Sequence, residues 1–178
     1  MKIVFDSQAL SGRKDFREVK MKFLDIVCAK AIVPDLKAKD RDGAITELIA
    51  AFAKAGRLKA AQSAEITKSV IKREREASTG MGKGVAVPHV KHAAVKEAIA
   101  AIGRSSRGID FSSLDKQPVY SVILLISPVD NPDNHLRAME CIFKHLQHEK
   151  FRKFLRQSQT VEQIEELIKE VDENPSFY

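Results

Sequence analysis

The chain has 178 residues, of which 44% are hydrophobic and 30% are charged, and its formal net charge is +6. This composition is typical of a globular domain with a full core, and no apolar run approaches the roughly 20 residues of a membrane helix, so we expect no insertion into a membrane. Basic and acidic residues are interspersed and aromatic residues make up 6%, a pattern that favours anionic ligands or partners over nucleic acid.

The first 20 residues differ from the rest of the chain, because they show no sustained apolar periodicity. We expect residues 1–20 to form an extension, residues 21–172 to form one domain, and residues 173–178 to form a tail. The break in composition leads to the hypothesis that Met21 is the native start, which the intact mass of native protein would test. The apolar start is too short for a signal peptide, and Cys28 and Cys141 suit reduced thiols, so we expect a cytoplasmic protein.

The first half of the domain predicts two amphipathic helices. The first begins at Asp40 or Asp42, either of which is a good N-cap, and continues to about Lys54. Its apolar residues recur at helical spacing, at Ile45, Leu48, Ile49 and Phe52. The second begins near residue 62 and ends near Glu76.

The second half alternates between predicted strands and helices. The expected strands are 85–87, 98–103 and 119–126, and the expected helices are 132–147, 150–156 and 160–171. The strand at 119–126 is nearly all apolar, as in a central strand that is covered on both faces. The helix at 132–147 is expected to bury Leu136, Met139, Ile142, Phe143 and Leu146. We therefore predict a single α/β domain with a sheet between helices.

The segment 73–89 holds the most informative pattern. It reads as a basic helix end, a glycine-rich turn and a short strand that stops at Pro88-His89. A Walker loop is excluded, because the glycine spacing is wrong and Gly84 stands where that loop needs a hydroxyl. A dinucleotide fingerprint is excluded, because its glycines come before a helix and not before a strand. A tight turn alone would explain the glycines, but not their combination with Pro88-His89 and the upstream arginines.

His89 is the candidate nucleophile of this pattern. A neutral imidazole has an available ring nitrogen at physiological pH, and backbone amides with arginines would hold the oxygens of a phosphoryl group. His135 follows the predicted central strand, at the start of a helix. If the two strand ends adjoin, one histidine would carry the group and the other would donate a hydrogen bond to it. The alternatives are a structural histidine at 89 and a surface histidine at 135.

A metal site is the other chemistry that these histidines would allow. His89 and His92 are three residues apart, and Cys141, His145 and His148 fall at helical spacing. The set has no tight ligand motif, and histidines at a helix end also interact favourably with the helix dipole. We therefore expect neither a metal nor another cofactor.

The order R-E-x-x-x-S-T-G-x-G-x-G-[IV]-A-[IV]-P-H over residues 73–89, with His135-Leu136 at the head of a later helix, resembles a known family. It is similar to the enzyme IIA domain of the fructose–mannitol class of the bacterial phosphoenolpyruvate-dependent sugar phosphotransferase system, including its nitrogen-regulatory branch. The resemblance covers about Met21 to Val171, and it implies a mixed sheet flanked by helices.

The resemblance also implies a function and a site. His89 would accept a phosphoryl group from an HPr-type phosphocarrier and pass it to a cysteine of a IIB domain. His135 would be the stabilising partner, Arg73 would lie beside the phosphoryl oxygens, and Thr79 and Gly80 would line the phosphate pocket. The chain would then be a phosphoryl carrier and not a turnover enzyme.

Two alternatives remain open. The chain could be a stand-alone regulatory module in which phosphorylation of His89 controls binding to a protein target. It could also be a basic protein that binds nucleic acid, which a steep salt dependence of binding would reveal.

Overall fold

The computed structural model describes residues 20–174 and 176–178, so the expected extension at 1–20 lies outside the described residues except for Lys20. The described helices are α1 (Phe23–Ile26), α2 (Arg41–Lys54), α3 (Ala60–Glu76), α4 (Pro132–Leu146), α5 (Glu149–Gln157) and α6 (Val161–Glu173). The described strands are β1 (Val27–Val33), β2 (Gly80–Gly82), β3 (Val85–Ala86), β4 (His89–Lys91), β5 (Ile99–Ile109) and β6 (Val119–Ser127).

The six strands form one mixed sheet with the order β1-β5-β6-β3-β2, and β4 also pairs with β6. Strand β6 runs antiparallel to β5 and parallel to β3 and β4, while β1 is parallel to β5. The apolar run that predicted a central strand is β6, and the side chains from Val122 to Ile126 have no exposed surface. β6 is therefore the central strand of the sheet, and it pairs with β5 on one side and with β3 and β4 on the other.

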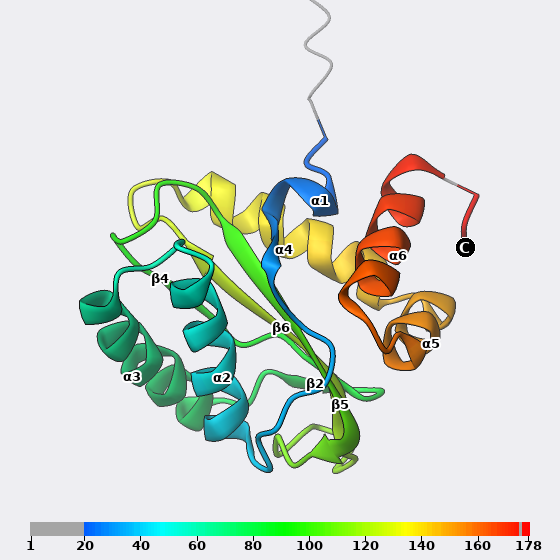
Figure 1. Cartoon of the computed structure of the whole chain (residues 1–178), viewed down its shortest axis with the longest axis horizontal. Helices are drawn as coiled ribbons and strands as arrows, with labels where there is room; N and C mark the ends of the chain where they lie inside the picture. The colour runs from blue at the N-terminus through cyan, green and yellow to red at the C-terminus, as the bar shows by residue number, and fades with distance from the viewer. Residues whose placement is uncertain (1–19, 175) are drawn as a thin grey trace, which may run out of the picture.

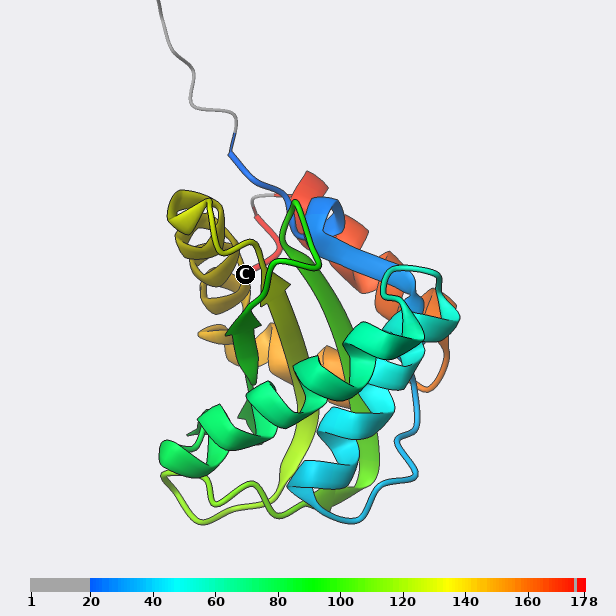
Figure 2. The same ribbon diagram turned by 90° about the vertical axis from the view of Figure 1, so that its left-hand side faces the viewer.

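Helices cover both faces of the sheet, as the sequence predicted (Figures 1 and 2). One apolar cluster lies under α2 and α3, and it includes Leu48 and Phe52 of α2. The other lies under α1, α4, α5 and α6, and it includes Ile142 of α4 and Ile168 of α6. The side chains of successive residues along β5 and β6 point alternately into the two clusters. The sheet therefore has one apolar layer on each face.

The predicted helix boundaries agree closely with the structure where a cap is present. Asp40 is the N-cap of α2, because its side chain accepts a hydrogen bond from the Gly43 amide at 2.7 Å. Helix α3 starts two residues before the expected position, at Ala60, and β5 extends to Ile109 beyond the expected end at residue 103. The added part of β5 pairs with β6 at Ile109 and Val119, across the loop that joins the two strands, and its polar residues 104–108 show no alternation that would predict a strand.

One predicted core position is wrong. The Leu136 side chain is 58% exposed, whereas the buried face of α4 is formed by Ala138, Cys141, Ile142, His145 and Leu146. Leu136 lies about 200° around the helix axis from Ala138, because each residue turns an α-helix by about 100°. Among the described residues, no helix is both long and apolar enough to cross a membrane.

Candidate functional site

His89 is the first residue of β4, a three-residue strand that pairs with β6. The strand pairs with β6, where His89 lies opposite Leu125, and the Leu125 amide donates to the Pro88 carbonyl at 3.0 Å. Val87 and Pro88 separate β3 from β4. The hydrogen-bond ladder with β6 is interrupted there, because proline has no amide hydrogen to donate. This break leaves the His89 side chain half-buried at the edge of the core.

The His89 imidazole has a defined tautomer. Its Nδ1 lies 2.9 Å from the Val87 carbonyl oxygen. A carbonyl oxygen only accepts hydrogen bonds, so Nδ1 must carry the proton in this contact. In the neutral ring the lone pair is then on Nε2, which makes Nε2 the nucleophilic atom.

His135 lies in the first turn of α4, and two asparagines fix the start of that helix. The Asn131 side chain caps it by accepting from the Asn134 amide at 3.0 Å. The Asn134 side chain accepts from the Ala98 amide at 2.8 Å, which ties α4 to the beginning of β5. Pro132 in the first turn also suits a helix start.

The fold brings the two histidines together, although 46 positions separate them in the chain. Their ring centroids are 5.7 Å apart, and the rings are inclined at 45°. The last residue of β6, Ser127, places its hydroxyl oxygen 2.7 Å from Nδ1 of His135. The two histidines meet as expected, but not at two adjoining strand ends: β3 pairs with Ser121 and Val122, and β4, which begins at His89, pairs with the last residues of β6.

Burial, followed by the nearby charges of His89 and Lys91, lowers the pKa of His135 below its usual value. His135 is therefore neutral at physiological pH. If Ser127 donates to Nδ1, the His135 proton is on Nε2, which then becomes a hydrogen-bond donor.

The glycine-rich segment forms a β-hairpin beside this site. Strands β2 and β3 are antiparallel, and Lys83 and Gly84 have φ angles of 57° and 78° in the turn. A Cβ atom on Gly80 would lie 2.4 Å from the Ser113 hydroxyl and 2.9 Å from its Cα, so only glycine fits there. The turn interpretation therefore accounts for Gly84, whereas Gly80 is required by the close approach of Ser113.

Sequence reasoning missed Glu74, which organises the end of the same segment. Its side chain is 1% exposed. One carboxylate oxygen accepts from the Thr79 amide at 2.7 Å and from the Ser78 hydroxyl at 3.1 Å, and the other accepts from the Thr79 hydroxyl at 2.7 Å. The Gly80 amide donates to the Ser78 hydroxyl at 3.1 Å. The signal in the sequence was a glutamate placed four and five residues before Ser-Thr.

These contacts bear on the expected phosphate pocket. The Thr79 and Gly80 amides, and the Thr79 hydroxyl, have intramolecular partners in the structure. The Arg73 side chain donates from Nη1 to the Ala77 carbonyl at 3.0 Å, at the end of its own helix. The pocket roles of Arg73, Thr79 and Gly80 stay predictions.

His92, His145 and the buried Cys141 have contacts of their own. His92 accepts from the Ala94 amide at 3.0 Å and lies 3.5 Å from the Glu65 carboxylate. Cys141 and His145 are in the core under α4, where burial raises the pKa of the Cys141 thiol to about 12. Within residues 20–174 and 176–178, no cluster of three or more metal-ligating side chains occurs.

Known proteins are similar to this chain in sequence. The chain matches the family described as "Phosphoenolpyruvate-dependent sugar phosphotransferase system, EIIA 2" over residues 25–171. It is 34% identical over 144 residues to a nitrogen regulatory protein of Bradyrhizobium diazoefficiens, with 81% of this chain and 92% of that protein covered. It is 31% identical over 133 residues to the fructose-specific EIIA component of Haloferax volcanii, with 75% and 85% covered.

A third relative is a larger protein. The chain is 31% identical over 152 residues to the fructose-specific EIIABC component of Bacillus subtilis, which covers 85% of this chain and 24% of that protein. The chain therefore spans about a quarter of that relative's length.

Solved structures agree with the fold. The nitrogen regulatory protein IIA-Ntr of Neisseria meningitidis has a TM-score of 0.72 and 25% identity, with 81% of this chain and 97% of that chain covered. The mannitol IIA in complex with phosphorylated IIB of Escherichia coli has a TM-score of 0.66 and 19% identity, with 80% and 96% covered, and this likeness concerns the fold. By its sequence match over most of its length, the chain belongs to the EIIA 2 family of the phosphoenolpyruvate-dependent sugar phosphotransferase system.

Proposed function

We propose that the chain is a phosphoryl carrier in which Nε2 of His89 accepts the phosphoryl group of an HPr-type phosphohistidine. A new bond from phosphorus to Nε2 would form while the bond to the donor nitrogen breaks. Transfer to a IIB cysteine thiolate would break the P–Nε2 bond and form a P–S bond, which returns the imidazole to its starting state. The observation that supports this proposal is the contact from Nδ1 to the Val87 carbonyl, because it leaves the lone pair on Nε2.

His135 would stabilise the phosphorylated state. Its ring is 5.7 Å from the His89 ring, and its Nε2–H would donate to a phosphoryl oxygen. The dianion would also attract a proton to His135, whose pKa is lowered in the unmodified protein. Arg73 would supply a fixed positive charge by leaving the Ala77 carbonyl and turning toward the phosphoryl oxygens.

The surface beside the pair suits a protein partner. Val129 and Leu136 are exposed apolar side chains on the loop after β6 and on the first turn of α4. Leu136 follows His135 directly and Val129 precedes it by six residues, and a docked carrier protein would cover them together with the histidines. One solved structure of the related mannitol IIA is a complex with phosphorylated IIB, which supports a IIB partner here.

A regulatory module is the second candidate. Its support is the nitrogen regulatory relative, because the match covers 92% of that protein. In this case phosphorylated His89 would change the charge of the docking surface and so control binding to a target protein.

The deciding experiment is intact-mass spectrometry after incubation with phosphoenolpyruvate, enzyme I and HPr. We expect the wild type to gain one acid-labile phosphate and His89→Ala to gain none. His92→Ala is the matched control, since it removes a nearby histidine that is not paired with His135, and it should still be phosphorylated. Phosphorylation of His89→Ala, or no phosphorylation of folded wild type, would overturn the carrier proposal. Transfer from the phosphorylated chain to a purified IIB domain then separates transport from regulation.

A further inference from the structure

A concentration of positive charge lies away from the histidine pair. A groove of about 580 Å³ is formed by α5, the second half of β5 and the turn between β2 and β3. Its charged residues are Lys83, Arg104, Arg152, Lys153, Arg156 and Glu149. The Arg156 guanidinium lies over the Tyr120 ring near the start of β6, whereas Ser127 contacts His135 at its end. Seven strand residues correspond to roughly 23 Å, so this groove is a separate place on the molecule.

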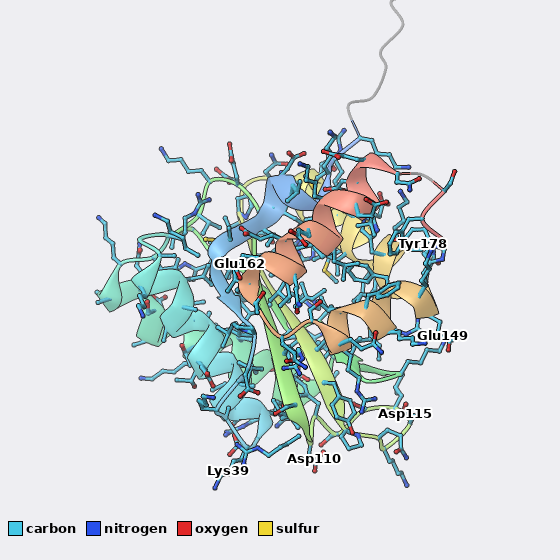
Figure 3. The ribbon with its side chains drawn as sticks, turned by 45° about the vertical axis from the view of Figure 1, so that its right-hand side comes forward. Lys39, Asp110, Asp115, Glu149, Glu162 and Tyr178 are labelled. Carbon is cyan, nitrogen blue, oxygen red and sulfur yellow. The ribbon has the colours of Figure 1, made fainter. Side chains whose placement is uncertain are left out.

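Figure 3 shows the outer side of this region, where Glu149 projects from the first turn of α5 and Asp115 marks the neighbouring loop. Glu149 is exposed, and it is the acidic residue that lines the groove. With five basic residues and one acidic residue, the lining has a net charge of +4. The field inside the groove therefore favours an anion.

The arginines of the groove are held by neutral groups. Arg104 donates to the Pro34 and Arg156 carbonyls, both at 2.8 Å. Arg152 donates to the last carbonyls of α4, both at 2.7 Å. The Arg156 guanidinium is 3.4 Å from the Tyr120 ring centroid. These contacts fix the guanidinium groups without neutralising them, which lowers the entropy lost when a ligand binds.

Carboxylates do not neutralise this charge either. In the part of the chain that the structure describes, no carboxylate lies within 4 Å of the charged nitrogens of the five basic residues. The nearby Asp35 pairs with Lys37, and Asp115 accepts from the backbone amides of Lys83 and Gln117. The like charges around the groove repel one another, and a bound anion would relieve this repulsion.

We propose that this groove binds a small anion with two or more phosphate groups, distinct from the phosphoryl group of the histidine site. Guanidinium groups match phosphate oxygens in a two-point geometry, and the volume is within the range of small-molecule sites. A nucleic-acid backbone would need an extended basic stripe, whereas this charge lies in one concave place.

The test is a calorimetric titration of the full chain with inorganic tripolyphosphate at low and at physiological ionic strength. We expect saturable binding of one anion per chain. The double variant K153Q/R156Q should weaken binding about 100-fold, since each lost charge-assisted contact to phosphate costs about tenfold. The control K68Q/K72Q removes the same charge from exposed positions on α3 and should bind like the wild type. His89→Ala should also bind like the wild type, which separates this site from the histidine pair.

Lys83→Asn is a second, independent variant, because asparagine accommodates the positive φ of Lys83. Lys83→Asn should weaken the binding of tripolyphosphate. Circular dichroism shows whether each variant is folded, and if K153Q/R156Q is not, Lys83→Asn still tests the proposal. The proposal is overturned if tripolyphosphate does not bind at low ionic strength, or if K68Q/K72Q weakens binding as much as K153Q/R156Q. It is also overturned if His89→Ala abolishes binding, or if duplex DNA binds the same residues more tightly than tripolyphosphate.

Discussion

At the scale of single residues, the site depends on hydrogen bonds that orient its reactive groups. The Val87 carbonyl selects the tautomer of His89, and the Ser127 hydroxyl contacts Nδ1 of His135. Glu74 does not contact His89, but it is connected to it through Thr79 and Val87. It holds Ser78 and Thr79, and the Thr79 carbonyl accepts from the Val87 amide at 3.2 Å, two residues before His89.

Replacing Glu74 by alanine should therefore destabilise the fold. Three hydrogen bonds would be lost, and the partly buried Thr79 amide would lose its carboxylate acceptor, which together cost about 1–3 kcal/mol. Urea unfolding measures this change in the free energy of unfolding. Glu76→Ala, an exposed position on the same helix, should change it by less than about 0.5 kcal/mol. Equal effects of the two variants would contradict the role of Glu74, and Glu74→Gln should be intermediate.

At the scale of elements, α4 carries both a core face and a site face. Its core face begins at Ala138, while its first turn holds His135 and the exposed Leu136 beside the loop after β6. The sequence pattern placed Leu136 in the core because an apolar residue at helical spacing is usually buried. The exposed Leu136 side chain is instead typical of a surface that binds another protein.

Leu136→Glu should slow phosphoryl transfer from phospho-HPr about tenfold, as expected for loss of an apolar contact in an interface. The melting temperature should not change, because the side chain is 58% exposed. Rapid-quench measurement of phosphorylation gives the rate. Leu114→Glu is the control, since Leu114 is 86% exposed on a loop between β5 and β6 and should leave the rate unchanged. If both variants transfer at the wild-type rate, Leu136 does not contribute to docking.

At the scale of the whole molecule, His145 joins elements that are distant in the chain. Its side chain is 2% exposed. The ring stacks on Phe23 of α1 with centroids 5.3 Å apart, Nδ1 contacts the Tyr178 hydroxyl, and Nε2 lies 4.0 Å from the Asp172 carboxylate of α6. Asp172 in turn accepts from the Phe23 and Leu24 amides, which caps α1.

This cluster predicts a pH dependence of stability. Burial, followed by the charge of Lys144, lowers the pKa of His145 from 6.5 to about 4, although Asp172 acts in the opposite direction. Below pH 6.5 the unfolded state binds the proton and the folded state does not, so stability falls as the pH drops from 6.5 to 4. Full loss of this contribution corresponds to about 3 kcal/mol.

Urea unfolding at several pH values between 7.5 and 4.5 tests this prediction against His145→Gln, whose side chain does not titrate. The variant should be less stable at pH 7.5, and its stability should fall less steeply with acid than that of the wild type. Parallel curves for the two proteins would show that His145 contributes nothing to the slope.

The sequence by itself determined the features that depend on local chemistry. An Asp cap starts α2, the apolar run forms the central strand β6, and Asn131 with Pro132 starts the helix that carries His135. The pattern around Pro88-His89 also identified the family. These features were predictable because caps, apolar runs and turns are encoded by neighbouring residues.

Only the tertiary structure decided which distant groups meet. The parallel pairing of β4 with β6 places His89 near His135, although the two residues are far apart in the chain. The exposure of Leu136 follows from the rotation of α4 on the sheet, and the basic groove combines residues from α5, β5 and a turn. Such contacts depend on strand order and on helix rotation about the axis, and no single segment of sequence contains that information.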